Sequence, residues 1–275
     1  MDYTALAAEA CGFTGIVLVV RAEIEAEVVD HVRRSWTAAL PVQFVRQPPL
    51  PGTAQAVLCA RSVVDGPFGV ANADDLYGEA ALRLLSEHLS AKASADRGDA
   101  AGDDRSAPVS DRHVLVAYQL FRTILTQATV TRGLCHFGDD RLLDRVAEHR
   151  VTLRDDGTFD AVPLVKAGAA RPGPADHVRL SGREPVSMNL WGFHTRLFDE
   201  LQAAVDAFDP ETAARPELLL PDVVGALVSG GGDQVHVVET GNRCIGITHR
   251  EDMAIVRQEV AHESAHLAAV RAAQR

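Results

Sequence analysis

The first 90 residues alternate short runs of β-branched residues with segments of helical periodicity. Such apolar runs predict buried strands, and the segments between them predict helices that connect one strand to the next. Strands spaced by helices indicate a parallel sheet covered on both faces, with ligands beyond the carboxyl ends of the strands. The predicted strands are 15–20, 41–45 and 68–71, and the predicted helices are 3–11, 23–34, 53–62 and 79–90.

The composition changes at residues 91–110, which are rich in charge and almost free of large aliphatic side chains. This segment cannot bury enough apolar surface to offset its ordering entropy, so we expect a flexible insertion. Asp155-Asp-Gly157 predicts a hairpin turn, and Gly230-Gly-Gly232 predicts another turn. Further strands are predicted at 113–118, 129–135, 143–153, 185–193 and 234–239, and helices at 195–207, 221–229 and 252–273. We therefore expect one α/β domain over residues 1–275, with a mixed sheet.

Charge and cysteine content exclude several classes of protein. A net charge of −11 argues against a nucleic-acid binder, because phosphate affinity comes largely from Lys and Arg. Lys92 and Lys166 are the only lysines, which leaves few candidates for a phosphate-binding lysine. No apolar run is long enough to span a bilayer, and the N-terminus lacks the pattern of a signal peptide. Widely spaced cysteines without a CxxC pair suggest reduced thiols, so we expect a cytoplasmic protein that does not bind membranes.

Two aspartates follow the predicted strand 68–71, in the segment Asn72-Ala-Asp-Asp-Leu-Tyr-Gly78. Asp74 and Asp75 therefore lie where an α/β sheet binds its ligands. Mg²⁺ commonly takes one or two carboxylates and completes its shell with water and substrate phosphate. We predict that both aspartates are metal ligands; an N-cap for the helix beginning near Gly78 is the alternative.

A proline-rich loop, Gln47-Pro-Pro-Leu-Pro-Gly-Thr-Ala-Gln55, joins a predicted strand to a predicted helix. Its prolines stiffen it, Gly52 permits close backbone approach, and Thr53 can cap the helix. A rigid loop that exposes amide edges can read a planar base through hydrogen bonds. A purely conformational role for Pro and Gly in the turn is the alternative.

Six stretches carry a family resemblance, and they occur in the family's order along the chain. They are GTAQAVLCA (52–60), GPFGVANADDLYG (66–78), VTRGLC (130–135), VSMNLWGF (186–193), LLLPDVV (218–224) and GITHRED (246–252). Together they resemble sugar-1-phosphate nucleotidyltransferases, the NTP-transferase group with a MobA-like domain. The resemblance implies a Rossmann-like three-layer α/β/α sandwich with a mixed, mainly parallel sheet. It also implies a Mg²⁺-dependent reaction that joins a nucleoside triphosphate to a sugar 1-phosphate and releases pyrophosphate.

On the nucleotide side, the resemblance assigns roles to positions in both loops. Asp74 matches the family's metal-binding aspartate and is implied to be catalytic, with Asp75 beside it as a further metal ligand. Gln47 and Gly52 match positions that contact the nucleobase, and Thr53 follows them in the same loop. These residues are the predicted nucleotide site.

On the sugar-phosphate side, the resemblance points to Glu148, His149 and Asn189. Glu148 resembles a family glutamate near the sugar phosphate and is the second implied catalytic residue. His149 stands where relatives carry a cation, and a neutral imidazole is a poorer phosphate partner. Ala128 replaces a sugar-contacting Gly of many relatives, and Gly246 replaces a second metal aspartate.

The family's N-terminal strand and Gly-rich phosphate loop have no counterpart in this sequence. Met1 matches a point roughly 35 to 45 residues into the family domain. We expect an N-terminally truncated domain that catalyses poorly alone, with a sheet edge open to a partner segment or a second copy. A true start upstream of Met1 is also open.

The leading hypothesis for function is synthesis of a nucleoside diphosphate sugar. The alternative is a catalytically inactive relative that binds a nucleotide or a partner subunit. A third motif, His262-Glu-Ser-Ala-His266, matches the H-E-x-x-H of zinc peptidases. The residues after it contain no His, Asp, Glu or Cys for the third zinc ligand, so we reject that interpretation.

Overall fold

The computed structural model describes residues 1–49, 52–90, 112–124, 129–164, 173, 176–210, 213, 216–246 and 261. The predicted insertion at 91–110 and the H-E-x-x-H segment lie outside this part of the chain, as does the predicted helix 252–273 apart from residue 261. Within the described ranges, no helix combines the length and apolarity needed to cross a membrane.

The helices begin and end close to their predicted bounds, because apolar side chains recur along one face of each. In the fourth helix, for example, the buried residues Ala81, Leu82 and Leu85 share one face. The helices are α1 (Asp2–Ala10), α2 (Glu25–Ser35), α3 (Thr53–Leu58), α4 (Glu79–Ser90), α5 (Leu197–Asp206) and α6 (Leu220–Ser229). Two 3₁₀ turns, η1 (Cys59–Ser62) and η3 (Leu120–Arg122), follow α3 and the strand β5 (His113–Gln119).

The strands also follow the predicted pattern, with short additions that the pattern did not indicate. They are β1 (Ile16–Val20), β2 (Val42–Arg46), β3 (Phe68–Val70), β4 (Asp75–Leu76), β5 (His113–Gln119), β6 (Val130–Phe137), β7 (Leu143–Leu153), β8 (Phe159–Pro163), β9 (Val178–Leu180), β10 (Pro185–Phe193), β11 (Val235–Thr240) and β12 (Ile245–Gly246). An eight-stranded sheet has the order β11-β5-β10-β6-β7-β8-β9, with β3 also on β10. The pairs β1-β2 and β4-β12 form small sheets of their own.

The α/β class and the mixed sheet are confirmed, but the prediction of a mainly parallel sheet is corrected. In the eight-stranded sheet β11 and β5 are parallel, whereas β10 is antiparallel to β3, β5 and β6, and β6 to β9 continue antiparallel. The reason is connection length, since tight turns join β6 to β7 and β7 to β8. A parallel pair needs a crossover of about a dozen residues. The predicted turn at 155–157 is confirmed, because Leu153 pairs with Phe159 across it.

Strand β1 is less buried than its sequence predicts. Of its five residues only Val20 is fully buried. Among the described strands β1 pairs with β2 alone, in parallel, through the crossover helix α2. Its other edge has no strand partner in the described part of the chain, so its apolar side chains stay half-buried.

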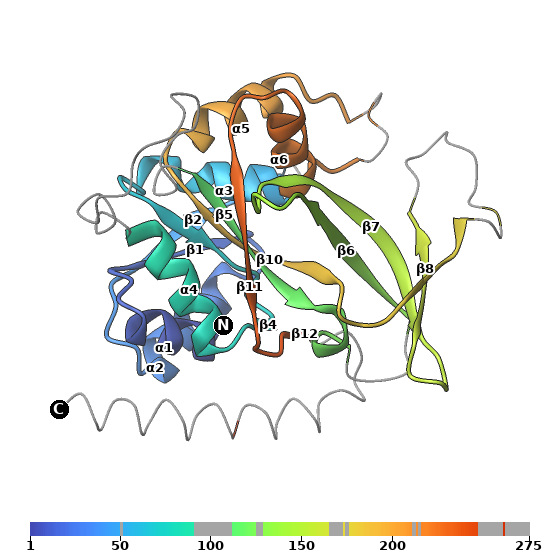
Figure 1. Ribbon diagram of the computed structural model, residues 1–275. Coiled ribbons are helices and arrows are strands. Elements are labelled where there is room, and N and C mark those ends of the chain that lie inside the picture. The colour runs from blue at the N-terminus through green and yellow to red at the C-terminus, as the bar shows by residue number, and fades with distance from the viewer. Residues whose placement is uncertain are drawn as a thin grey trace, which may run out of the picture.

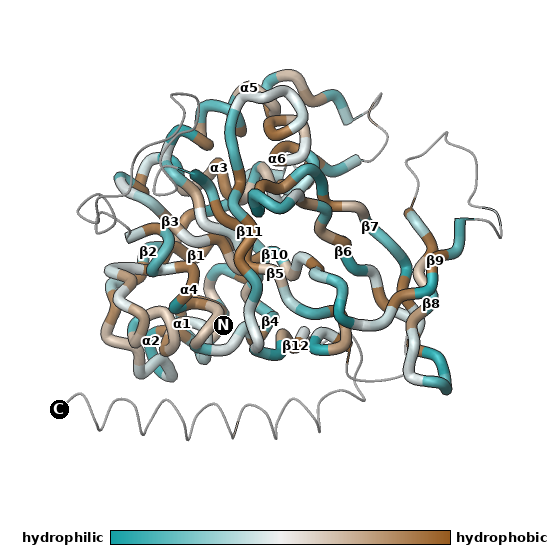
Figure 2. Tube along the Cα trace, in the orientation of Figure 1, coloured by the Kyte–Doolittle hydropathy of each residue, from teal (hydrophilic) through white to brown (hydrophobic). Residues whose placement is uncertain are grey.

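Alternate residues of β5 face two separate hydrophobic cores. Val114, Val116 and Tyr118 pack in the core that includes residues of α1 and α4. Leu115 and Ala117 pack in the core formed with α3, α5 and α6. Side chains of a strand alternate between faces, so this one strand is covered by helices on both sides (Figure 1). The predicted three layers are therefore present, and Figure 2 shows the hydrophobic chain segments gathered along β5, β10 and β11 between the helices.

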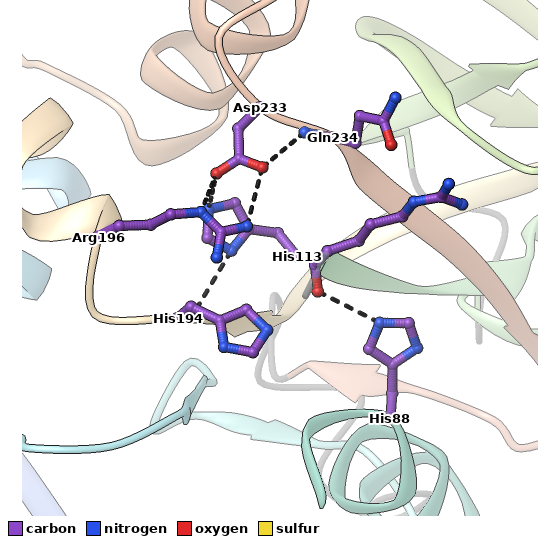
Figure 3. Close-up of polar contacts among 7 residues, drawn as sticks. His88, His113, His194, Arg196, Asp233 and Gln234 are labelled. Carbon is purple, nitrogen blue, oxygen red and sulfur yellow. Dashed lines mark hydrogen bonds and ion pairs between the residues drawn. The ribbon is translucent and has the colours of Figure 1, made fainter. Parts of the chain in front are cut away.

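A buried histidine joins the amino ends of β5 and β11 to the loop after β10 (Figure 3). His113 is fully buried, and its Nδ1 accepts the backbone N–H of His194 at 3.2 Å. The neutral ring therefore carries its proton on Nε2, which lies 3.1 Å from Asp233 Oδ2. Arg196 donates to the other carboxylate oxygen of Asp233 at 2.9 Å. Burial lowers the pKa of His113 to about 4, and this effect outweighs the opposing attraction of Asp233.

We expect this histidine to make the fold sensitive to acid. Because its folded pKa lies below the ordinary 6.5, the unfolded chain takes up the proton first, and stability falls as the pH drops from 6.5 toward 4. Between pH 7 and pH 5 the loss from this residue is about 2 kcal/mol. Urea unfolding at both pH values measures it. His113→Gln should remove that part of the pH dependence, whereas the exposed control His177→Gln should keep it. An equal loss of unfolding free energy between pH 7 and pH 5 in all three proteins would contradict the role of His113.

Candidate active site

The loop after β3 holds two aspartates in different surroundings. Asp74 is exposed, whereas Asp75 is half-buried and belongs to β4. Asp75 Oδ2 accepts hydrogen bonds from Asn72 Nδ2 at 2.9 Å and from the Tyr77 hydroxyl at 3.2 Å. Burial raises the pKa of Asp75; the Asn72 bond opposes this, the charge of Asp74 adds to it, and Tyr77 and Arg132 oppose it. We name residues 72–78 the acidic loop.

The donors of the acidic loop fit Mg²⁺ delivered with a nucleotide. Hard carboxylate oxygens suit this ion, which usually keeps water and phosphate as its other ligands. Within the described ranges no three His, Cys, Asp or Glu side chains are grouped to hold a metal by themselves. The acidic loop thus offers one or two carboxylates as metal ligands. The side chain of Asp75 accepts hydrogen bonds from Asn72 and Tyr77. A helix cap would instead accept the backbone N–H groups at the start of α4.

Gly246 lies directly against Asp75. The two residues are register partners in the β4-β12 pair. A Cβ atom on Gly246 would lie 2.4 Å from Asp75 Oδ1, so a side chain there would require the Asp75 carboxylate to shift. At the position where the resemblance implies a second metal aspartate, the backbone of this chain packs against Asp75 instead.

The proline-rich loop after β2 is closed on itself and held at both ends. The Gln47 backbone N–H donates to Val20 O at 2.8 Å, which continues the β1-β2 pairing. The Gln47 side chain donates through Nε2 to Gly52 O at 3.2 Å. We name residues 47–53 the proline loop; Leu50 and Pro51 lie outside the described residues. The bond across the loop fixes its width.

The proline loop is also attached to the start of α6. The Thr53 hydroxyl oxygen accepts the backbone N–H of Leu220 at 2.8 Å, and the Ala54 N–H donates to Leu218 O at 3.1 Å. Thr53 therefore caps α6, where free N–H groups need partners, and makes no side-chain capping bond to its own helix. Gly52 has φ +123°, and a Cβ there would lie 2.2 Å from Leu218 O. Only glycine allows this close approach.

The predicted sugar-phosphate residues Glu148 and His149 lie on opposite faces of β7. Glu148 pairs with Gly133 and His149 with Arg132 on β6. Adjacent residues of a strand point to opposite sides of the sheet, so the two cannot contact one ligand on one face. Val146, two residues before Glu148, packs with the core of α3, α5 and α6, which places Glu148 on the side of the proline loop. His149 is buried, and its Nδ1 lies 2.9 Å from Ala147 O.

Asn189 occupies an irregular turn within β10. The register between β10 and β5 shifts between Ser187 and Trp191, and Asn189 has φ +59°. Left-handed backbone is uncommon for a residue other than glycine and is tolerated best by Asn and Asp. The Asn189 N–H donates to Ser187 Oγ at 3.2 Å. We name residues 187–191 the Asn189 bulge.

The structure brings the predicted residues into two groups. The acidic loop and the Asn189 bulge are linked, because the Tyr77 hydroxyl also lies within donating distance of Met188 O, at 3.0 Å. The proline loop forms a second group with the start of α6. Sequence reasoning missed Tyr77 and Leu218: Tyr77 stood inside a quoted motif, whereas nothing in the local sequence joins residue 218 to residue 52. Ala128 lies outside the described residues.

The model of a known family matches the part of the chain that contains both loops. The family model described as "Nucleotidyl transferase" matches residues 1–102, the stretch that contains the proline loop and the acidic loop. Residues 1–102 are thus similar to the nucleotidyl transferase family. The match supports nucleotidyl transfer as the class of reaction. It also confirms, at the family level, the resemblance drawn from the motifs.

Beyond the nucleotidyl transferase match, the comparison with solved structures concerns the fold. The inositol-1-phosphate CTP transferase from T. maritima superposes with a TM-score of 0.55 and 14% sequence identity. The alignment covers 91% of this chain and 76% of that chain, so the similarity of fold extends well past residue 102. No curated protein matches this chain significantly.

Proposed function

We propose that this protein transfers a nucleotidyl group from a nucleoside triphosphate to a sugar 1-phosphate and releases pyrophosphate. The observation that carries the proposal is the acidic loop: exposed Asp74 beside Asp75, which Asn72 and Tyr77 hold at the carboxyl end of β3. This is the end of the strand at which α/β sheets bind ligands. The match of residues 1–102 to nucleotidyl transferases supports the reaction class.

The chemistry follows from placing both substrates beside the acidic loop. A phosphate oxygen of the sugar phosphate attacks the α-phosphorus of the nucleotide. The bond from that phosphorus to the oxygen that bridges the α- and β-phosphates breaks, and this oxygen leaves with pyrophosphate. Asp74 and Asp75 would hold Mg²⁺, which when bound neutralises charge on the phosphates. Asn189 would orient the sugar phosphate beside the acidic loop and Glu148 from the side of the proline loop, so catalysis consists mainly of positioning. His149 lies on the opposite face of β7 from Glu148, the face of its pair partner Arg132, whose charge acts on Asp75.

We also propose a reducing compartment, the cytoplasm, as the place of work. All four cysteines are free thiols, and three of them are buried. Burial raises the pKa of the Cys11 thiol to about 11, which keeps it protonated and unreactive at neutral pH.

Pyrophosphate release tests the proposal. The protein is incubated with Mg²⁺, each of the four common nucleoside triphosphates, and a panel of sugar 1-phosphates that includes inositol 1-phosphate. Release should require both substrates and stop with EDTA. Nucleotide binding without release under any combination would replace the proposal with the binding-protein alternative. If the protein neither binds a nucleotide nor releases pyrophosphate, the proposal and the binding-protein alternative are both overturned.

The proline loop should select the nucleobase. A Gln side chain carries an NH₂ group that donates and a carbonyl oxygen that accepts, so it can pair with the edge of a base. Gln47→Ala should flatten the ranking of nucleoside triphosphates in a thermal-shift screen, lowering the preference for the best one by roughly tenfold. The melting temperature of the free protein should change less, and Gln43→Ala on the exposed side of β2 serves as control. An unchanged ranking would leave Gln47 with its contact to Gly52 alone.

A further inference from the structure

The Tyr77 hydroxyl is a junction between the acidic loop and the Asn189 bulge. Tyr77 is 1% exposed, so its hydroxyl makes its bonds inside the protein. It accepts the Asn72 backbone N–H at 2.9 Å and lies within donating distance of Asp75 Oδ2 at 3.2 Å and Met188 O at 3.0 Å. These partners come from the loop after β3 and from the middle of β10.

A phenol has one proton, so Tyr77 donates to one acceptor at a time. The Asp75 carboxylate and the Met188 carbonyl therefore compete for the same hydrogen. Any ligand that draws charge away from Asp75 makes it a weaker acceptor and favours the bond to Met188. The state of the acidic loop is thus transmitted to the backbone of β10.

The Met188 carbonyl belongs to the strained part of β10. The following residue, Asn189, has φ +59°, and its N–H donates to Ser187 Oγ at 3.2 Å. Trp191 Nε1 lies 3.5 Å from Asn189 Oδ1, a long contact that holds the side chain weakly. A stronger bond to the Met188 carbonyl would hold the peptide that precedes Asn189, and with it the direction of the Asn189 side chain.

We propose that Tyr77 is a positioning residue that couples the two substrate sites, so that occupation of the acidic loop by a metal-bound polyphosphate tightens the Asn189 bulge. The inference rests on the proposed function, since it takes Asp74 and Asp75 as the polyphosphate side and Asn189 as the sugar-phosphate side. Nucleotide would then favour subsequent binding of the sugar phosphate.

Hydrogen exchange of backbone amides tests the coupling with magnesium tripolyphosphate, a probe that needs no knowledge of the base. In the unmodified protein, saturating probe should slow exchange at Asn189 as well as at Asn72. In Tyr77→Phe, free of ligand, both amides should exchange roughly tenfold faster. With probe added, this variant should regain protection near Asp74 but not at Asn189. A purely structural role for Tyr77 would leave the response of Asn189 to the probe unchanged.

Tyr118→Phe is the matched control. Tyr118 is also fully buried, and its hydroxyl donates to the Tyr77 backbone carbonyl at 2.9 Å without a hydrogen bond to Asn72, Asp75 or Met188. This variant should keep the response of Asn189 to the probe. Thermal melting confirms that both variants fold; should Tyr77→Phe fail to fold, the unmodified protein still decides, because an Asn189 amide indifferent to bound probe overturns the coupling.

The outcomes separate this inference from the proposed function. Calorimetry on the unmodified protein shows whether magnesium tripolyphosphate binds at all, and absence of binding counts against the proposed function. The ligand-free comparison remains valid in that case. Equal exchange of Asn189 in Tyr77→Phe and in the unmodified protein would overturn the junction at Tyr77.

Discussion

Asp74→Asn should reduce turnover by roughly 10² to 10³-fold, the size of effect seen when one preorganised charge or donor at a transition state is removed. Asn keeps the shape of the side chain but removes the charge that balances Mg²⁺. Asp74 is exposed, so the substitution should leave folding intact. Steady-state pyrophosphate release, with calorimetric titration of nucleotide in the presence and absence of Mg²⁺, measures the effect.

Asp139→Asn provides the matched control for this prediction. Asp139 is an exposed aspartate in the turn between β6 and β7 and is not part of the acidic loop. It should keep full turnover and full nucleotide affinity. If Asp74→Asn binds nucleotide with unchanged affinity and an unchanged requirement for Mg²⁺, Asp74 is no metal ligand.

Gly52→Ala should lower the free energy of unfolding by about 3 kcal/mol, combining backbone strain with displacement of neighbouring backbone. The new Cβ would lie 2.2 Å from Leu218 O, at a φ of +123° that L side chains rarely adopt. The loop and the start of α6 must then separate, which breaks the bond from Leu220 N–H to Thr53. We expect nucleotide affinity to fall with stability, because the width of the proline loop depends on these contacts.

Urea unfolding at pH 7 measures this loss against Gly66→Ala. Gly66 has open space where a Cβ would be added, so its variant should stay within about 0.5 kcal/mol of the unmodified protein. If Gly52→Ala proves as stable as Gly66→Ala, the close approach of the proline loop to Leu218 is wrong.

Local pattern predicted the elements of this fold well. The apolar run at residues 113–118 became strand β5, and the periodic segment 79–90 became α4 with the same bounds. Both signals are local, because a helix or strand shows which of its faces will be buried by the spacing of its own side chains. For the same reason the acidic loop could be assigned to the end of a strand from residues 68–78 alone.

Strand direction could not be predicted in the same way. The alternation of strands and helices in residues 15–90 predicted parallel pairing, and β1 with β2 obeys it. β3 instead pairs antiparallel with β10, which lies more than a hundred residues later in the chain. Pairing between distant strands depends on which edges meet when the two cores form, and no local spacing encodes that meeting.

The sequence by itself determined the element order, the similarity of residues 1–102 to nucleotidyl transferases, and the presence of Asp74 and Asp75 after β3. Only the tertiary structure decided which predicted site residues can act together. It separated Glu148 from His149 through strand alternation, turned Thr53 into a cap for α6, and joined Asp75 to the Asn189 bulge through Tyr77. The physical reason is that side-chain chemistry and periodicity are properties of neighbouring residues, whereas hydrogen bonds such as that from Tyr77 to Met188 join backbone and side chains that only the folded chain brings within 3.0 Å.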